Sequence, residues 1–356
     1  MSKTFLIIHT SRIGGAEKRF FELWQFLAAK DVSYYLVLSK NLYQKLDIEK
    51  EPQINQVIFY DFELSTLGFA NTSKTFIREY TKKQDIVHFI IDYPIIYTNR
   101  KTIYSITQSS LSNLNWKGKL MHLFGVLISN RVDVLDPSIY QTAKRWSFLN
   151  PSKLSLTSCS FCNTELYEPQ PKENWIVFLG RFFYLKQVVP FVRCIPAIYK
   201  KCKEQNIKDV QFFILGHGEQ EEEIKNLISH PAYEEISIKV GFEREPNNIL
   251  NKSKVFLSLQ KENNYPSRSL IEAFASGNMA VVTDNGQTRW LAKPEFSEYV
   301  NESFTDKELV EAIYKCLAMS EEEFSIIAGR ARNFILENHN VEKMATYFQI
   351  CYNQIK

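Results

Sequence analysis

Short apolar runs, each followed by a polar turn or a helical stretch, recur along this chain. In its first half the pattern predicts strands at 4–9, 34–38, 57–60, 86–90, 102–108, 132–137 and 154–157. In its second half it predicts strands at 175–179, 210–215, 236–240, 255–259 and 279–282. Such runs are typical of strands buried on both faces of a parallel sheet. Helical stretches separate many of them and fill 306–356, so the pattern predicts an α/β protein.

A polar, proline-rich segment divides the two series of strands. Residues 167–174 read Tyr-Glu-Pro-Gln-Pro-Lys-Glu-Asn, a composition typical of a linker. The chain has 356 residues, which is enough for two domains with a core each. We therefore predict an N-terminal domain at 1–168 and a C-terminal domain at 174–335.

The stretch 255–290 carries the strongest chemical signal. A strand at 255–259 runs into a polar loop, and a helix predicted to begin at Pro266 stops at Gly277. Ligands of open α/β sheets bind at the carboxyl ends of the strands. Free N–H groups in a first turn made by Pro266, Ser267, Arg268 and Ser269 would favour a phosphate. Glu272 could accept two hydrogen bonds from a ribose diol; an ordinary solvated helix is the alternative.

Two further segments suit an anionic ligand. Gly14 and Gly15 stand between the first strand and a helix, where glycines let backbone N–H groups approach a phosphate, although a plain turn needs them too. Arg181 and Lys186 follow the strand at 175–179, near a helix start, and could neutralise a diphosphate.

The segment from Asn263 to Asn278 resembles the signature of the family 4 (group 1) retaining glycosyltransferases. Gly14-Gly15-Ala16-Glu17, Gly180-Arg181 with Lys186, and Gly216-His217-Gly218 are similar to further motifs of that family. The resemblance covers nearly the whole chain and is strongest over 175–290. It implies a GT-B fold of two Rossmann-like domains facing across a cleft, with a last helix, 336–356, packed back on the first domain. It also implies transfer of a sugar from a nucleotide-sugar to an acceptor hydroxyl, without a metal or a cofactor.

The resemblance assigns roles to particular residues. It implies that Arg181 and Lys186 hold the donor diphosphate, that Glu272 binds the ribose, and that Gly14 and Gly15 lie near the phosphates. The remaining donor-side positions are Gly216, Phe242 at the base, Asn263 or Asn264 at the place of a first glutamate, and Tyr265, Pro266, Ser267, Arg268 and Ser269. His88 and Thr107 are the acceptor-side candidates, although a buried histidine that only packs in the core is the more frequent case. Ile90 and Thr107 stand where many relatives carry histidines.

Composition and charge limit the class of protein, the cellular compartment and the partners that we expect. Apolar residues make up 45% and charged residues 23%, and no uncharged apolar run of spanning length or signal peptide is apparent. Six cysteines in such a chain predict reduced thiols in a cytosol, and Cys159 and Cys162 lack a second pair to complete a metal site. Residues 1–170 hold 20 Lys and Arg against 15 Asp and Glu. This excess, with the Trp, Lys and apolar mixture at 114–128, fits an anionic membrane surface or acceptor. Ordinary solvated faces explain the excess about as well, and a packed amphipathic helix is the more frequent explanation of 114–128.

We therefore expect a cytoplasmic glycosyltransferase with a glycan or lipid-linked acceptor at the inner face of a membrane, and no nucleic-acid partner. A non-catalytic subunit that binds a partner enzyme stays open, because the first glutamate and a cleft histidine are missing. The three residues Arg181, Lys186 and Glu272 count against that alternative. Another sugar-nucleotide enzyme, such as an epimerase, also stays open. An NAD-dependent dehydrogenase is disfavoured, since no Gly-x-Gly-x-x-Gly follows the first strand.

Overall fold

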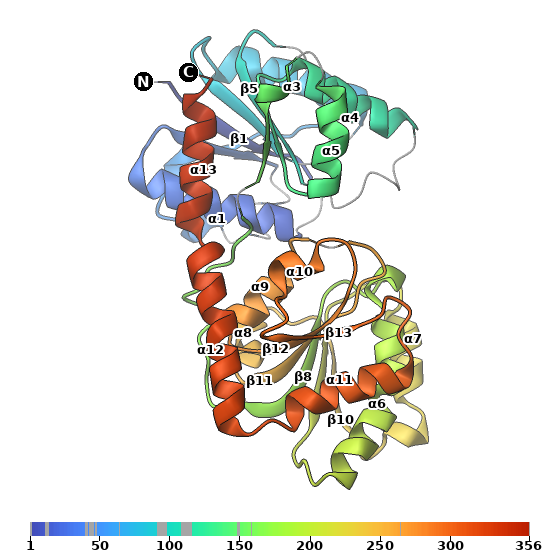
Figure 1. The fold of residues 1–356 in the computed structure, drawn as a ribbon. Helices are drawn as coiled ribbons and strands as arrows, with labels where there is room; N and C mark the ends of the chain where they lie inside the picture. Colours follow the sequence, from blue (N-terminus) through green and yellow to red (C-terminus); the bar gives the residue numbers. More distant parts are fainter. Residues whose placement is uncertain are drawn as a thin grey trace. The chain divides into compact units, whose positions relative to one another are not determined.

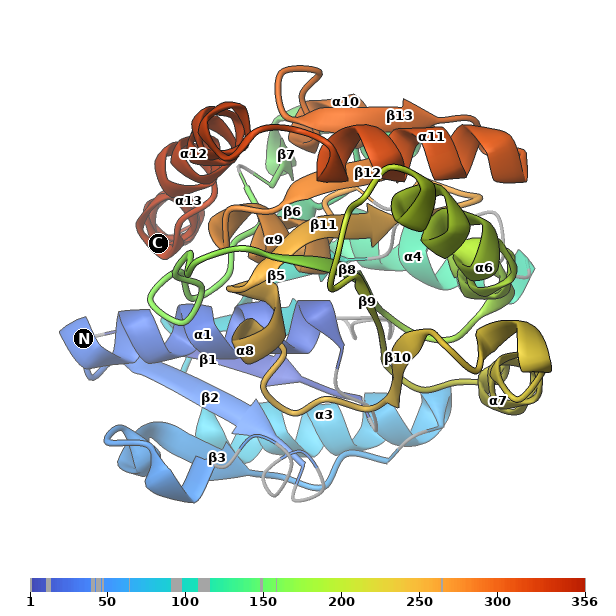
Figure 2. The ribbon, with the colours of Figure 1, turned by 90° about the horizontal axis from the view of Figure 1, so that it is seen from below.

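The computed structural model describes residues 2–10, 14–39, 42, 46, 48–63, 65–90, 98–107, 116–147, 150–157, 159–263 and 265–355. The chain forms two compact units. Unit 1 comprises Met1–Ser160 and Val341–Lys356, and unit 2 comprises Phe161–Asn340. Each unit is built on a parallel sheet with helices on both faces, as Figures 1 and 2 show.

Unit 1 contains a seven-stranded parallel sheet in the order β3-β2-β1-β4-β5-β6-β7. Its strands are β1 (Thr4–Ile8), β2 (Tyr34–Leu38), β3 (Val57–Phe59), β4 (Ile86–Ile90), β5 (Lys101–Ile106), β6 (Arg131–Val134) and β7 (Leu154–Leu156). Its helices are α1 (Gly15–Lys30), α3 (Thr66–Tyr80), α4 (Trp116–Ile128), α5 (Pro137–Trp146) and α13 (Val341–Asn353). Short 3-10 turns lie at Ile48–Lys50, Ile54–Gln56 and Pro151–Lys153.

Successive side chains of the central strands point to opposite faces of the sheet, and this explains the layers of unit 1. Val87 and Phe89 of β4 join the core that α3, α4 and α5 cover. His88, between them, points to the other face, where its ring contacts Phe20 of α1 and Phe348 of α13. The predicted return of the last helix to the first domain is confirmed, because α13 packs against α1.

A buried polar network fastens α13 to the sheet of unit 1. Asp133 of β6 is 1% exposed, and its Oδ1 accepts hydrogen bonds from Tyr347 of α13 at 2.5 Å and from Thr157 at 2.9 Å. Ser105 donates to Oδ2 at 2.9 Å. Burial raises the pKa of Asp133, whereas these hydrogen bonds and the charge of Arg19 lower it. The carboxylate therefore depends on donors that come from distant parts of the chain.

The network continues to His88, and its hydrogen bonds determine which ring nitrogen of His88 carries the proton. Because the Ser105 hydroxyl proton points to Asp133, His88 Nε2 must donate to Ser105 Oγ, 2.7 Å away. His88 Nδ1 then accepts from the Tyr352 hydroxyl at 2.9 Å. Burial, and to a smaller extent the charge of Arg19, lowers the pKa of His88 to about 3, so the ring is neutral.

Unit 2 contains a six-stranded parallel sheet in the order β10-β9-β8-β11-β12-β13. Its strands are β8 (Glu173–Leu179), β9 (Gln211–Leu215), β10 (Ser237–Gly241), β11 (Ser253–Ser258), β12 (Met279–Thr283) and β13 (Ser297–Val300). Its helices are α6 (Val188–Glu204), α7 (Glu221–Ile228), α8 (Asn247–Leu250), α9 (Arg268–Ala275), α10 (Thr288–Leu291), α11 (Asp306–Leu317) and α12 (Glu321–Asn338). One core lies under α6, α7 and α11, and the other lies under α8, α9 and α12 (Figures 1 and 2).

The observed elements differ from the sequence expectations in two places. The strand β13 was not predicted. The helix expected to begin at Pro266 begins at Arg268 instead, because Ser267 is an extended N-cap residue with φ −71° and ψ 116°. The first turn expected at 266–269 therefore starts two residues late, and its N–H donors belong to 268–270.

The proline-rich segment at 167–174 packs on unit 2, which itself begins at Phe161. Tyr167 is buried, and Arg332 donates to the carbonyl oxygens of both Tyr167 and Ala275. Lys172 Nζ donates to the Ser276 carbonyl oxygen at 2.6 Å. These cations lie at the carboxyl end of α9, whose carbonyl groups carry partial negative charge. Proline content alone did not distinguish a free linker from a segment held in this way.

We predict that Tyr347→Phe lowers the free energy of unfolding by about 1–3 kcal/mol, because it removes a donor from the buried Asp133 carboxylate. Urea unfolding of the purified protein measures the change. Tyr80→Phe, on the exposed surface of α3 in the same unit, is the matched control and should change it by less than about 0.5 kcal/mol. Equal effects of the two substitutions would contradict the role of Tyr347.

Candidate functional site

The candidate donor-side residues gather at the carboxyl edge of the unit 2 sheet. The chain runs from β8 outward to β9 and β10, and then returns to β11 on the other side of β8. The loops after β8 and β11 therefore diverge between two adjacent strands, which is the position where open α/β sheets bind ligands. Arg181 and Lys186 lie on the first of these loops, and the segment leading to α9 lies on the second.

Two glycines let the loop after β9 lie directly against the loop after β8. Gly216 has φ +149°, and a Cβ there would stand 1.9 Å from the Gly180 carbonyl oxygen. A Cβ on Gly218 would stand 2.4 Å from the Phe182 carbonyl oxygen. The Phe182 amide donates to the His217 carbonyl oxygen at 2.9 Å. Gly216 was predicted as a donor-side turn, and the structure shows the steric reason for glycine there.

Arg181 and Lys186 place two cations on the loop after β8. Arg181 is exposed, while Lys186 is partly buried at the end of the 3-10 turn Tyr184–Lys186. Burial, and then the charge of Arg181, lowers the pKa of Lys186 to about 8. A group of opposite charge bound between them would offset both effects, so this loop is poised to take an anion.

The start of α9 adds backbone donors close to this loop. The Lys261 amide donates to the Leu185 carbonyl oxygen at 2.9 Å, which ties the segment before α9 to the turn that carries Lys186. Ser267 is the N-cap residue, and its side chain makes no capping hydrogen bond. Its Oγ lies 3.4 Å from Ser269 Oγ instead. The first N–H groups of α9 are therefore not capped by the residue best placed to do so, and they can serve an anion.

Glu272 lies one turn into α9, in a buried cluster of polar side chains. Arg268 Nε lies 2.8 Å from Glu272 Oε1, and the two side chains are only 12% and 9% exposed. Burial raises the pKa of Tyr167, and the charge of Glu272 and a hydrogen bond to it raise that pKa further. Arg268 thus reaches Glu272 with its side chain, a role that the sequence did not suggest. Tyr167 was missed because it lies about one hundred residues away along the chain.

Asn263 braces two loops. Its Oδ1 accepts hydrogen bonds from the Tyr265 amide at 3.3 Å and from the Gln287 amide at 3.1 Å. Gly286, with φ +49°, lies so close that a Cβ there would stand 2.6 Å from Asn263. The side chain at the predicted place of the first glutamate therefore shapes the turn after β12. Asn264, the other residue considered for that place, lies outside the described residues.

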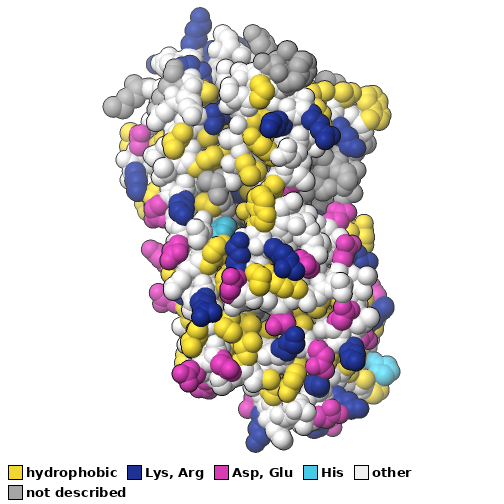
Figure 3. All heavy atoms as spheres, in the orientation of Figure 1, with side chains coloured by type: hydrophobic (Ala, Val, Ile, Leu, Met, Phe, Trp, Pro, Cys, Tyr) yellow, Lys and Arg dark blue, Asp and Glu magenta, His cyan; other side chains and the backbone are white. Residues whose placement is uncertain are grey.

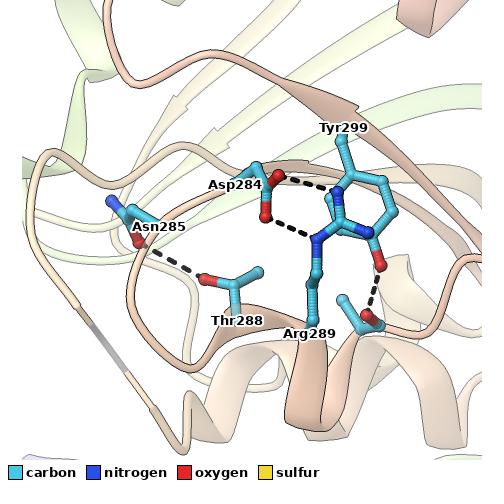
Figure 4. Close-up of polar contacts among 6 residues, drawn as sticks. Asp284, Asn285, Thr288, Arg289 and Tyr299 are labelled. Atoms are coloured by element: carbon cyan, nitrogen blue, oxygen red, sulfur yellow. Dashed lines mark hydrogen bonds and ion pairs between the residues drawn. The ribbon is translucent and has the colours of Figure 1, made fainter.

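The turn after β12 is held by an ion pair and an aromatic ring (Figure 4). Arg289 donates to both carboxylate oxygens of Asp284, at 2.8 and 2.7 Å, and its guanidinium stands 4.3 Å from the ring centre of Tyr299. Hydrogen bonding to Arg289 lowers the pKa of Asp284. Trp290, on the same short helix, meets Tyr265 edge to face at 5.5 Å. Tyr265 and Pro266 thus lie on a loop that contacts α10, the short helix that follows β12.

An exposed aromatic pair marks the other side of the same sheet edge. Phe242, which follows β10, is largely exposed, and its ring centre lies 5.8 Å from that of His217 after β9. The two rings meet at 67°, an edge-to-face arrangement. Phe242 was predicted beside a base, and an exposed ring has the flat apolar face that stacking needs.

Among the candidates of unit 1, the structure contradicts only the role predicted for His88. Gly14 caps α1, its amide donates to Glu17 Oε2 at 2.8 Å, and both Gly14 and Gly15 are exposed. Thr107 follows β5 and is partly buried. His88 is fully buried with both ring nitrogens hydrogen-bonded, so its proposed acceptor-side role is corrected: it is a core residue of the Asp133 network.

All six cysteines are buried. Within the described part of the chain, we find no group of three or more His, Cys, Asp and Glu residues that could hold a metal ion. None of the helices in that part is long and apolar enough to cross a bilayer.

Comparisons with known proteins agree with this architecture. The family model for glycosyl transferases group 1 matches residues 165–332. Curated protein sequences provide no match. A glycosyltransferase from Rickettsia africae is 16% identical, with 99% of this chain and 98% of that chain covered and a TM-score of 0.77. HepE of Anabaena, in complex with UDP and glucose, is 13% identical, with 99% and 100% covered and a TM-score of 0.79.

A sucrose-phosphate synthase from Thermosynechococcus elongatus is similar over 99% of this chain and 98% of that chain, at 16% identity and a TM-score of 0.75. At these identities the likeness establishes the fold, and the predicted GT-B class is confirmed. Residues 165–332 match the glycosyl transferases group 1 family, and the fold of the whole chain is that of the GT-B glycosyltransferases.

Proposed function

We propose that the protein transfers a sugar from a nucleoside diphosphate sugar to an acceptor hydroxyl, with retention of configuration at the anomeric carbon. One observation carries the proposal: Arg181, Lys186 and the start of α9 lie on two loops that the Lys261–Leu185 hydrogen bond joins. Two cations and a helix N-terminus form a matched site for a diphosphate.

The diphosphate is the leaving group, so its negative charge grows as the bond to the sugar breaks. Arg181 and protonated Lys186 would stabilise that charge, and the N–H groups of 268–270 would add fixed dipoles. No metal takes part in this proposal, since the protein cations supply the charge that a metal would otherwise supply. No side chain of the protein forms a bond to the sugar.

The nucleoside would extend from the diphosphate toward Glu272 and Phe242. Glu272 would accept hydrogen bonds from the ribose diol, with Arg268 keeping its carboxylate in place. Phe242 would stack on the base, with the ring of His217 supporting it edge to face. UDP is the first nucleotide to test, because HepE, which shares the fold, was solved with UDP and with UDP-glucose.

Unit 1 would serve the acceptor, a glycan or a lipid-linked sugar used in cell-surface polysaccharide or glycolipid synthesis at the inner face of a membrane. Thr107, which follows β5, is the described acceptor-side candidate, while Gly14 and Gly15 stay predicted near the donor phosphates. A second candidate function, a non-catalytic subunit, is favoured by Asn263, which braces a loop where relatives carry a glutamate. Nucleotide binding and sugar transfer distinguish the two.

We predict that UDP raises the melting temperature of the wild-type protein, since a ligand of the native state stabilises it by mass action. Arg181→Ala should raise the dissociation constant about 10- to 100-fold, the effect of losing a charge-assisted hydrogen bond. Arg193→Ala is the control, because Arg193 is an exposed arginine of α6 that pairs with Glu223. No shift with UDP, GDP, ADP or CMP would contradict the donor site and favour the non-catalytic subunit.

The lowered pKa of Lys186 predicts proton uptake on binding. Between about pH 8 and 10.5 the free native protein holds this lysine mostly neutral, whereas an adjacent diphosphate favours the ammonium. At pH 8 binding should take up roughly half a proton, and affinity should fall as the pH rises further. Calorimetry in two buffers of different ionisation enthalpy measures the uptake. Lys186→Met should abolish it, and uptake that persists in this variant would exclude Lys186 as its source.

We expect Arg268→Met to destabilise the protein by about 2–4 kcal/mol, because it leaves the buried Glu272 carboxylate without its partner. Replacing both residues, Arg268→Met with Glu272→Met, should restore most of that loss while abolishing UDP binding. Arg193→Met, at an exposed ion pair, should cost less than about 1 kcal/mol. Urea unfolding measures all three, and a double variant as unstable as the single one would refute the pairing.

A further inference from the structure

Helix α4 of unit 1 presents apolar side chains on its outer face as well as its inner face. Inward, His122, Gly125 and Val126 are buried against the sheet, where His122 hydrogen-bonds Tyr104. A surface helix normally turns charged residues outward. Four of the outward residues of α4 are instead apolar: Trp116, Leu120, Phe124 and Leu127, which are 68%, 51%, 48% and 40% exposed.

These four residues, the outer stripe, form one continuous surface. Their spacing of four, four and three residues places them within an arc of about 80° on the helix. Four of the thirteen large hydrophobic residues that are exposed in the described structure thus gather on a single helix of 13 residues. Figure 3 shows hydrophobic side chains gathered where Figure 1 draws α4, with Lys and Arg beside them.

The exposed charge of the segment that carries the outer stripe has one sign. Residues 98–157 contain eight Lys and Arg and only two acidic residues, Asp133 and Asp136, and both are buried. Lys117 and Lys119 are exposed on α4 on either side of the stripe. Lys144 and Arg145 are exposed on α5, which packs against α4.

We propose that α4 docks on an anionic lipid bilayer, lying in the plane of the interface. The outer stripe enters the boundary between headgroups and acyl chains, where Trp is especially favoured. The aliphatic chains of the lysines extend away from the acyl chains and place their ammonium groups among anionic headgroups. The surface of an anionic bilayer complements the cations on α4 and α5. No acidic side chain of residues 98–157 is exposed beside these cations. The inference deepens the membrane location given in the proposed function, but docking needs neither donor nor acceptor, so it is tested separately from sugar transfer.

The test is co-sedimentation of the full chain with vesicles of phosphatidylcholine containing about one-third phosphatidylglycerol, at low salt and without nucleotide. Wild-type protein should bind these vesicles far more strongly than vesicles of phosphatidylcholine alone. Lys117→Gln with Lys119→Gln should lower the partition constant about 30-fold, roughly fivefold for each charge removed. Trp116→Ser with Leu120→Ser should lower it at least tenfold, because both side chains lose apolar contact with lipid.

A double variant on another helix controls for general loss of exposed apolar surface. Ile326→Ser with Leu336→Ser, on α12, also removes two exposed apolar side chains and should leave vesicle binding unchanged. Circular dichroism and the melting temperature verify that each variant folds. Absent binding to the anionic vesicles, or binding that the α4 stripe variant retains, would overturn the proposal. So would a wild-type dimer that this variant dissociates without any vesicle binding, since the stripe would then cover a second copy.

Discussion

Parallel pairing of β8 with β9 on one side and with β11 on the other is the constraint on which the candidate site depends. Parallel strands bring their carboxyl ends to one edge, and the reversal of strand order leaves space between the loops after β8 and β11. Arg181 and the start of α9, more than eighty positions apart, follow adjacent strands at one sheet edge only because the sheet is arranged in this way. The glycines at 216 and 218 then let the loop after β9 press against the loop after β8 without a steric clash.

Each unit contains a buried carboxylate whose hydrogen-bond donors include groups from distant parts of the chain. In unit 1 the Asp133 carboxylate draws hydroxyl donors from β5, from the end of β7 and from α13, which fastens the last helix of the chain to a sheet formed by its first 160 residues. In unit 2 Glu272 draws Arg268 and Tyr167 around it. A buried carboxylate is stable only when it is well supplied with donors, so each of these groups fixes the position of several elements at once.

The site also shows how one residue type changes its role with its surroundings. At the place of a family glutamate, Asn263 braces two loops through a neutral amide oxygen, which can accept from backbone N–H groups without the desolvation cost of a charge. His88, a candidate for acceptor contact, is neutral and belongs to the Asp133 network. These assignments leave Arg181, Lys186 and the N-terminus of α9 as the features of unit 2 on which the proposed diphosphate site depends.

The sequence by itself determined the strand pattern, the two-part organisation and the motifs at Gly14, Arg181, Lys186 and Glu272, because each depends on residues close together along the chain. It placed β2 and β4 at their observed bounds, since both are continuous apolar runs. Tertiary structure alone decided the partners of Glu272, the bracing by Asn263, the burial of His88 and the outward face of α4. These depend on contacts between distant segments and on which helix face meets a sheet, and no local pattern of residues fixes either.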